Sequence, residues 1–333
     1  MKYKYIYFNT TFAKQWINDP DDYFVICIKD LEKYDNIQIV PIMMYSCPMF
    51  LRKLYYLHFA LTRKLHFPFL SIWFHLFFKN KFKGCKNEEL CFIIGGSLYP
   101  GEFAKWLRKK YKGSKLVRIH RDLLKVTCNN GYNEKMLRET FDLQMSYDTA
   151  EAKQHGFEHF DEFESRIDID ENELNKYPKV SVFFAGLAKD RFDKILKIAR
   201  ILKEKSISFY FYVVGVPKEK RVEMEGMVYG EKLMSYKEML YRTIRADCSL
   251  EINQEGGTGF TSRFIEAVLY NKKLITDNAF VKETKFYNDK FIQCVSNFDD
   301  IDTDFITNNQ MVEYNYNGEF SPVNIINIIE KKL

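Results

Sequence analysis

The stretch from Ser249 to Glu266 reads Ser-Leu-Glu-Ile-Asn-Gln-Glu-Gly-Gly-Thr-Gly-Phe-Thr-Ser-Arg-Phe-Ile-Glu. Its first four residues are predicted to form a strand, the glycines that follow form a loop, and a helix is predicted to begin near Ser262. Glycines let a backbone approach a ligand closely, while the free amides and the dipole of a helix start favour negative charge. The stretch therefore predicts a phosphate-binding turn in an α/β fold.

Polar side chains at the start of this helix can complete such a site. Thr261 or Ser262 can cap the helix or donate a hydrogen bond. Arg263 and Glu266 are three residues apart, so they share a helix face, where one could meet a diphosphate and the other a pair of ribose hydroxyls. The alternative is a plain helix cap after a flexible turn, with Arg263 and Glu266 paired at the surface.

Composition indicates a folded protein of two domains. The chain has 333 residues, which suits two domains of about 150 residues each. It is 46% hydrophobic and 17% aromatic, which argues against disorder. The formal net charge of +5 is too small to require a nucleic-acid partner, and none is expected.

The cysteines and the apolar runs point to a cytoplasmic protein. Seven cysteines are scattered without a C-x-x-C spacing, so neither a disulfide framework nor a zinc site is expected. The N-terminus shows no signal-peptide pattern. The longest apolar run, residues 69–78, is about half of the roughly twenty residues that a membrane-spanning helix needs. We therefore expect a chain that does not cross a membrane.

Apolar runs and amphipathic runs alternate along the chain, which predicts parallel sheets covered by helices. The predicted strands are residues 3–8, 23–28, 90–94, 116–119, 180–185, 208–214, 248–252 and 273–276. The predicted helices are residues 101–112, 191–205, 236–245 and 262–270. The acidic stretch 160–178 is predicted to be a linker, so the domains are expected to span residues 1–170 and 171–333.

The order of residues around the glycine loop extends into a longer pattern. Glycine, threonine, arginine and glutamate-alanine follow one another as G-x-T-x-R-x-x-E-A over residues 259–267, with Lys272-Lys-Leu-Ile-Thr276 and Asn278 behind them. This order resembles the C-terminal half of glycosyltransferases for capsule and O-antigen (lipopolysaccharide) synthesis. Residues 182–186 and 209–215 resemble the opening strands of the same domain, and 141–157 resembles the segment before its linker. The resemblance covers about residues 90–298.

The resemblance implies the glycosyltransferase-B fold, with two Rossmann-like domains facing a cleft. The C-terminal domain would bind a nucleotide sugar as substrate, with no cofactor, and the N-terminal domain an acceptor. The residues expected on the donor side are Gly186, Lys189, Arg191, Gly215, Gly257, Gly259, Thr261, Ser262 and Glu266, with Arg263 in catalysis. Retaining members often carry a second glutamate eight residues before the first, where this chain has Thr258, so the stereochemistry stays open.

Polar residues follow the predicted strand 116–119 and are expected on the acceptor side. Asp122 is the preferred general base, with His120 as a second catalytic residue and Arg121 as an acceptor contact. Gly95 and Gly96 end another strand and could let the acceptor approach. The alternatives are a strand end in which Asp122 caps the next helical turn, and a plain tight turn at the glycines.

The segment from about residue 45 to 86 is basic and aromatic. It lies within a stretch, 36–87, that contains no Asp or Glu, and Pro48 and Pro68 divide it into two short amphipathic helices. Such helices can lie on an anionic bilayer, which suits a lipid-linked oligosaccharide acceptor. The alternatives are aromatic residues in the core with solvated cations, and binding of single-stranded RNA.

No metal site is expected. Asp168-Ile-Asp170 and Asp302-Thr-Asp304 have the D-x-D spacing of another glycosyltransferase fold, but they lie in the linker and in an acidic loop. The sequence thus predicts a metal-independent glycosyltransferase of bacterial surface polysaccharide synthesis. It is expected in the cytoplasm, peripherally associated with the inner face of the cell membrane. The alternatives are a nucleotide-sugar epimerase of the same fold and a non-catalytic scaffold of the assembly machinery.

Overall fold

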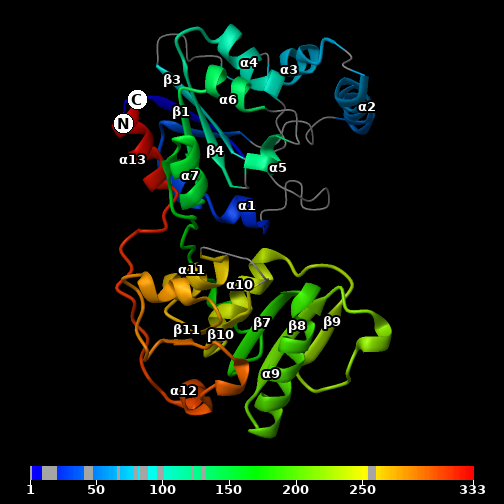
Figure 1. Cartoon of the computed structure of the whole chain (residues 1–333), viewed down its shortest axis with the longest axis vertical. Helices are drawn as coiled ribbons and strands as arrows, with labels where there is room; N and C mark the ends of the chain where they lie inside the picture. Colours follow the sequence, from blue (N-terminus) through cyan, green and yellow to red (C-terminus); the bar gives the residue numbers. More distant parts are fainter. Residues whose placement is uncertain are drawn as a thin grey trace. The chain divides into compact units, whose positions relative to one another are not determined.

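In the computed structural model the chain forms two compact units, which are described separately (Figure 1). Unit 1 consists of Met1–Ser165 and Ser321–Leu333, and unit 2 of Arg166–Phe320. The structure describes residues 2–9, 21–40, 48–65, 68–78, 82, 89–95, 101–121, 124–128, 133–253 and 260–333.

Unit 1 is built on a parallel six-stranded sheet of order β2-β1-β3-β4-β5-β6. The strands are β1 (Lys4–Phe8), β2 (Ile37–Val40), β3 (Leu90–Gly95), β4 (Lys115–His120), β5 (Leu143–Ser146) and β6 (Glu158–His159). Every residue of β3 is buried, as expected of a parallel sheet covered on both faces. Phe8 and Phe92 enter the core on one face, and Tyr7 and Ile93 enter the core on the other.

The helices of unit 1 cover both faces of its sheet. They are α1 (Tyr23–Ile26), η2 (Lys29–Lys33), α2 (Met49–Leu65), α3 (Ser71–Phe78), α4 (Gly101–Lys110), α5 (Leu124–Cys128), α6 (Glu134–Thr140), α7 (Thr149–His155) and α13 (Val323–Lys332). α3 and α4 bring Phe74, Phe78 and Phe103 to the face of Phe8, whereas α13 brings Ile326 to the face of Tyr7.

Unit 2 is a second parallel six-stranded sheet of order β12-β11-β10-β7-β8-β9. The strands are β7 (Val182–Leu187), β8 (Phe209–Val214), β9 (Met227–Gly230), β10 (Cys248–Glu251), β11 (Lys273–Thr276) and β12 (Ile292–Cys294). The chain starts at β7, runs outward to β9, then returns to the other side of β7 with β10. This doubly wound order places a topological switch point between β7 and β10, the place where ligands bind in such sheets.

The helices of unit 2 lie between these strands along the chain, except α8, which precedes β7, and η7 and α12, which follow β12. They are α8 (Glu171–Leu174), η4 (Lys189–Arg191), α9 (Phe192–Glu204), η5 (Lys218–Lys220), α10 (Tyr236–Arg245), α11 (Ser262–Leu269), η6 (Ala279–Glu283), η7 (Phe298–Asp300) and α12 (Thr303–Thr307). The alternating strands and helices of both units confirm the predicted α/β class.

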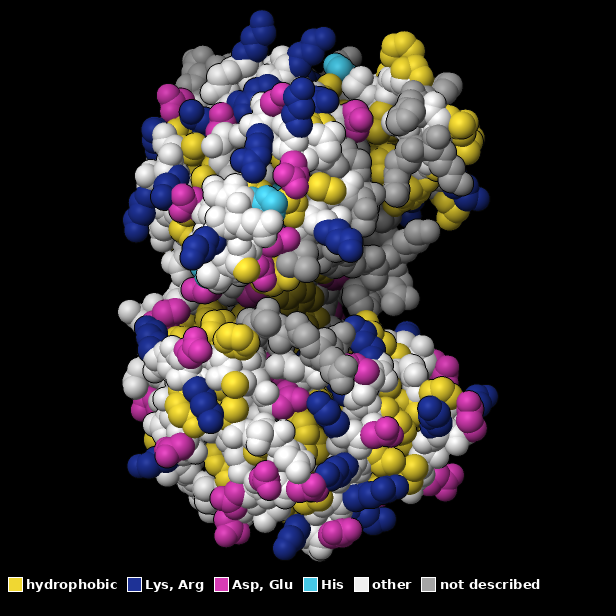
Figure 2. Space-filling view, in the orientation of Figure 1, with side chains coloured by type: hydrophobic (Ala, Val, Ile, Leu, Met, Phe, Trp, Pro, Cys, Tyr) yellow, Lys and Arg dark blue, Asp and Glu magenta, His cyan; other side chains and the backbone are white. Residues whose placement is uncertain are grey.

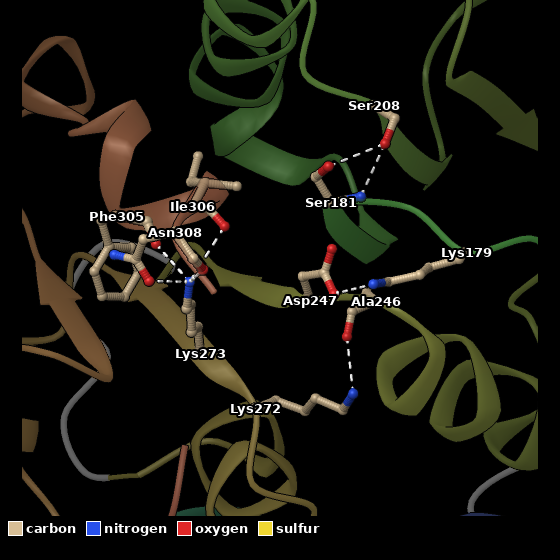
Figure 3. A network of polar contacts seen from close by, with 10 residues as sticks. All are labelled: Lys179, Ser181, Ser208, Ala246, Asp247, Lys272, Lys273, Phe305, Ile306 and Asn308. Carbon is tan, nitrogen blue, oxygen red and sulfur yellow. Dashed lines mark hydrogen bonds and ion pairs between the residues drawn. The ribbon is translucent and has the colours of Figure 1, made fainter. Parts of the chain in front are cut away.

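A polar network at the amino end of this sheet is anchored by two adjacent lysines (Figure 3). Lys272 donates to the Ala246 carbonyl at 2.9 Å. Lys273 is buried, and its ammonium donates to the Phe305 carbonyl at 2.8 Å and to the Asn308 side chain at 2.7 Å. The buried cation thus satisfies carbonyls that the end of α12 leaves without partners inside that helix.

Two predictions about unit 1 were wrong. Residues 23–28 were predicted as a strand, but α1 forms there because the Asp22 carboxylate caps the Phe24 amide at 2.7 Å. The C-terminal residues were assigned to the second domain, yet 321–333 belong to unit 1, and the break falls after Ser165 rather than at 170. The buried face of α13, with Ile326 and Ile329, explains this return to the first sheet.

Candidate functional site

The strand and the helix on either side of the predicted phosphate turn meet at the carboxyl edge of the unit 2 sheet, next to the switch point. β10 ends at Glu251, and α11 begins at Ser262, which is partly buried. Thr261 caps this helix, since its hydroxyl accepts a hydrogen bond from the Arg263 amide at 3.2 Å. The strand and helix of the predicted turn are therefore confirmed, while Gly257 and Gly259 lie outside the described residues.

Two arginines converge on Gly186 near the end of β7. A Cβ at position 186 would lie 3.2 Å from Nη2 of Arg191 and 3.1 Å from Nη2 of Arg263. The two guanidiniums also lie near the Phe184 ring, 5.6 Å and 5.4 Å from its centroid. Arg191 follows β7 and Arg263 opens α11 after β10, so the two sides of the switch point each contribute one cation.

Backbone carbonyls orient both arginine side chains, and several guanidinium N–H groups remain available to donate hydrogen bonds. Arg191 donates to the Leu187 carbonyl at 3.1 Å and to the Ile252 carbonyl, thus joining the ends of β7 and β10. Arg263 donates to the Ala185 carbonyl. A guanidinium has five N–H donors, so most of these donors keep no partner within the described residues.

The positive charges of the two arginines repel one another. Burial lowers the pKa of Arg191, and the nearby charge of Arg263 lowers it further. Within the described residues, no carboxylate forms an ion pair with either guanidinium. An anion that binds between the two guanidinium groups removes their repulsion and can accept hydrogen bonds from both. The arrangement therefore favours the binding of an anion.

Glu266, predicted to contact the donor, lies on the first turns of α11 and is fully buried. Burial raises the pKa of its carboxyl group to about 7, and the Arg263 charge and the Tyr236 hydroxyl act in the opposite direction. Neither carboxylate oxygen has a hydrogen bond of normal geometry within the described part of the chain. Glu266 can therefore bind or release a proton near neutral pH.

Glu251 was not singled out by the sequence, yet it holds the site together. Its buried carboxylate accepts hydrogen bonds from the hydroxyls of Thr261 and Thr276. It thereby ties the end of β10 to the cap of α11 and to the end of β11. Burial raises the pKa of Glu251, whereas the two hydroxyls lower it. The only sequence signal was a single acidic residue at the end of the strand.

The other residues that were predicted to contact the nucleotide sugar lie at the same edge of the sheet, but fewer contacts fix their positions. Lys189 is exposed in η4 and has a positive φ of 42°. Gly215 follows β8 with a φ of 81°, and nothing lies within 4 Å of where its Cβ would be. Its glycine is required by the backbone conformation there, because other residues rarely adopt it.

On the acceptor side, the environment of His120 does not suit a general base. Its buried ring stacks on Phe157 at 5.0 Å, and Nε2 lies 3.2 Å from the Gln144 amide oxygen. Burial lowers the pKa of His120 to about 3, so the ring has little tendency to take a proton at neutral pH. Asp122, the preferred base, lies outside the described residues.

Arg121 is engaged inside unit 1 rather than open to an acceptor. Its guanidinium pairs with Glu162 at 2.7 Å, donates to the Tyr23 hydroxyl at 3.0 Å and lies 4.4 Å from the Phe163 ring centroid. It ties the segment after β6 to α1. Gly95 ends β3, where an added Cβ would make only an ordinary contact with the Tyr7 hydroxyl at 3.5 Å, and Gly96 lies outside the described residues.

The two D-x-D motifs serve as helix caps. Asp170 accepts from the amide of Asn172 at the start of α8, and Asp302 accepts from the amide of Asp304 at the start of α12. Among the residues with described positions, no group of three or more His, Cys, Asp or Glu is placed to bind a metal ion. Within the same residues, no helix has the length and apolar character needed to span a bilayer.

The fold agrees with that of known sugar-nucleotide enzymes. No family model matches the chain, and no curated protein matches it by sequence. An alpha-glucosyltransferase in complex with UDP and a 13-mer DNA containing a HMU base is 10% identical, with a TM-score of 0.52 over 99% of each chain. The UDP-GlcNAc 2-epimerase from Methanocaldococcus jannaschii is 12% identical, with a TM-score of 0.50 over 98% of this chain and 99% of that one.

At such low identity these similarities concern the fold alone. Both solved structures match over nearly the full length of the chain, and each unit has the parallel sheet and interleaved helices of a Rossmann-like domain. The chain therefore has the two-domain glycosyltransferase-B fold.

Proposed function

We propose that the chain is a glycosyltransferase that takes its sugar from a nucleoside diphosphate sugar bound by unit 2. The observation that carries the proposal is the convergence of Arg191 and Arg263 on Gly186 at the switch point of the sheet. A diphosphate is a compact dianion whose oxygens can accept from both guanidiniums. The helix start at Thr261 adds a favourable dipole.

The same groups would act in the chemical step. When the bond between the sugar and the diphosphate breaks, negative charge grows on the leaving oxygen. Arg191 and Arg263 are already oriented by carbonyls, so they would stabilise this charge without reorganising. Because these two cations are present, we propose transfer without a metal, and activity that persists in a chelator would agree. Glu266 would contact the ribose hydroxyls in its protonated form, which can both donate and accept a hydrogen bond.

We further propose a lipid-linked oligosaccharide as the acceptor, bound by unit 1 at the inner face of the cell membrane. Two observations support it. The sequence resembles glycosyltransferases of capsule and O-antigen synthesis. The stretch 36–87 of unit 1 contains cations but no acid, and although most of its described aromatic residues belong to the core, Phe50 and Phe69 are exposed. The product would then be part of a bacterial surface polysaccharide.

A nucleotide-sugar epimerase is the second candidate, because the same fold serves a UDP-GlcNAc 2-epimerase. The two functions differ in their need for an acceptor. An epimerase would convert the nucleotide sugar when it is incubated alone, whereas a transferase would need a lipid-linked saccharide to consume it at an appreciable rate.

A panel of nucleotide sugars, screened by thermal shift, tests donor binding, since a bound donor stabilises the fold by mass action. The matching donor is then incubated with bacterial lipid extract, and incorporation of labelled sugar is measured. We expect Arg263→Gln to lower transfer about 100-fold, as removal of a charge-stabilising donor does in other enzymes. Arg200→Gln, at an exposed position of α9, is the matched control. Near-normal transfer by Arg263→Gln would refute the assignment.

A further inference from the structure

The outward face of α2 is more apolar than a solvent-facing helix should be. Phe50, Leu54 and Leu57 are 69%, 38% and 58% exposed, and their spacing of four and three residues puts them on one face. The inward face is a separate aromatic one, with Tyr55 buried and Phe59 packed against the core. The outward residues are therefore not needed to hold the helix on unit 1.

α3 continues this surface. Phe69 just before it and Ile72 and Leu76 on it are 70%, 62% and 56% exposed, while Phe74 and Phe77 are buried. We name the six exposed residues the α2–α3 ridge: Phe50, Leu54, Leu57, Phe69, Ile72 and Leu76. Eight of the twelve large hydrophobic side chains that are exposed in the described part of the chain fall between residues 49 and 76. This is a patch rather than the usual scatter.

The two helices are fixed to one another beneath the ridge. The Trp73 indole donates to Nδ1 of His58 at 3.0 Å, and Nε2 of His58 lies 2.8 Å from the Pro68 carbonyl. The Tyr55 ring lies 5.9 Å from Trp73 and 5.8 Å from Phe77. The ridge is therefore presented by a packed pair of helices. Figure 2 shows hydrophobic side chains gathered in the region where Figure 1 places α2 and α3.

Exposed lysines lie on α2 and on α4, the helix that packs against α3. Lys53 is exposed on α2, one turn before Leu57. α4 packs against α3, and its exposed positions include Lys105, Lys109 and Lys110, with Glu102 as an acidic residue at its start. An apolar ridge with a lysine on its own helix and further lysines on the neighbouring helix complements an anionic lipid surface, where hydrocarbon meets phosphate headgroups.

Other occupants match this surface less well. In a symmetric contact between two copies of the chain, the same patch meets itself, so the basic sides would repel one another. Nucleic-acid interfaces are polar, and their apolar contacts rely on aromatic stacking, whereas four of the six ridge residues are aliphatic.

We propose that the α2–α3 ridge docks unit 1 on an anionic bilayer, with its apolar side chains inserted among the acyl chains and the flanking lysines on lipid phosphates. The inference deepens the proposed function, since it rests on that function for the lipid-linked acceptor. Vesicle binding and sugar transfer are measured separately, so one can fail without the other.

Flotation of the full chain with vesicles tests the proposal. The vesicles contain phosphatidylcholine alone or with phosphatidylglycerol. We expect binding to the anionic vesicles, and at least a tenfold loss of the partition coefficient in Leu57→Glu/Ile72→Glu. The matched control is Leu233→Glu/Met311→Glu, which alters exposed apolar residues of unit 2 and should bind like the wild type. Lys53→Gln/Lys105→Gln/Lys109→Gln should lose the preference for anionic vesicles and keep the residual binding to neutral ones.

Two controls test whether the variant is still folded and whether the added charge causes the loss of binding. Binding of the nucleotide sugar, measured by thermal shift, should be unchanged in the ridge variant. Leu57→Ser/Ile72→Ser, which adds no charge, should show a smaller loss of vesicle binding. Wild-type protein that stays unbound, or ridge variants that bind normally, would overturn the proposal. The proposal would also be overturned if the wild type bound no vesicles but formed a dimer or an RNA complex that the ridge variant did not form.

Discussion

Arg191 and Arg263 point their Nη2 atoms at the same place, the position that a side chain on Gly186 would occupy, 3.2 Å and 3.1 Å away. Residue 186 is thus a glycine that two cations enclose. Since the far ends of arginine side chains can shift, a methyl group there would displace the guanidiniums rather than the sheet.

Gly186→Ala should therefore fold and bind the donor poorly. We expect its dissociation constant for the nucleotide sugar to rise about tenfold, because the two displaced guanidinium groups could no longer both donate hydrogen bonds to one diphosphate. Calorimetric titration measures this directly. Gly95→Ala is the control for donor binding, since its added methyl group would make only an ordinary contact. Unchanged affinity in Gly186→Ala would contradict the arginine pair as the diphosphate site.

Donor binding should take up protons at neutral pH. The pKa of Glu266 is about 7, and a diphosphate near Arg263 would raise it further, because negative charge disfavours a second anion. A nucleotide sugar is suited to this test, as its diphosphate does not titrate near pH 7. Titrations in buffers of different ionisation enthalpy should show uptake of up to about half a proton per donor bound. Glu266→Gln should abolish the uptake, and uptake that persists would exclude Glu266 as its source.

The stability of unit 2 should fall as the pH rises through 7. The folded-state pKa of Glu266, about 7, lies above its ordinary value of 4.5, so the folded chain binds more protons between these values. The stabilisation is complete below pH 4.5 and is lost as the pH rises, by an amount on the order of 3 kcal/mol. Glu266→Gln should remove this dependence and make the protein more stable than the wild type at pH 8. Denaturant unfolding at several pH values checks it.

Glu251 should act as a positioning residue for the α11 cap. Its carboxylate accepts from both Thr261 and Thr276, and Glu251→Gln leaves one oxygen to serve two hydroxyls. We expect a higher KM for the donor with a smaller change in kcat, and a loss of about 1–2 kcal/mol in donor binding. Thr261→Val should have a similar effect. In the double variant the two losses should not add, because both break one contact. Additive losses would argue for separate roles.

Lys273 should matter for folding and little for catalysis. Its buried ammonium donates to the Phe305 carbonyl and to Asn308, so Lys273→Met would leave acceptors unpaired and cost on the order of 2 kcal/mol of stability. Lys272→Met removes a single contact with Ala246 and should cost less. Thermal unfolding compares the two variants. If both variants lost the same stability, the hydrogen bonds between Lys273 and the end of α12 would not explain the loss.

Much of the fold could be predicted from the sequence. The bounds of α10 and β11 are the predicted ones, and those of β3, β8, β10 and α11 differ by one residue or so. Such elements follow from alternation and periodicity within a few residues. The predicted strand at 23–28 failed because an apolar run of that length suits a strand or a buried helical turn, and only the Asp22 cap favours the helix.

The candidate site divides in the same way. Thr261 as the helix cap and a helix start after β10 follow from local rules, because capping involves neighbours along the chain. The weak basicity of His120 and the raised pKa of Glu266 could not be predicted, since both result from burial by distant segments.

The sequence by itself determined the α/β class, the parallel order of strand and helix, and the position of the helix start that carries Arg263. Only the tertiary structure decided that Arg191 meets Arg263 across the switch point, that Glu251 supports the cap, and that residues 321–333 return to unit 1. The physical reason is how far apart along the chain the interacting residues lie. Secondary structure depends on contacts between near neighbours, whereas burial and the grouping of charges depend on which distant strands the sheets bring side by side.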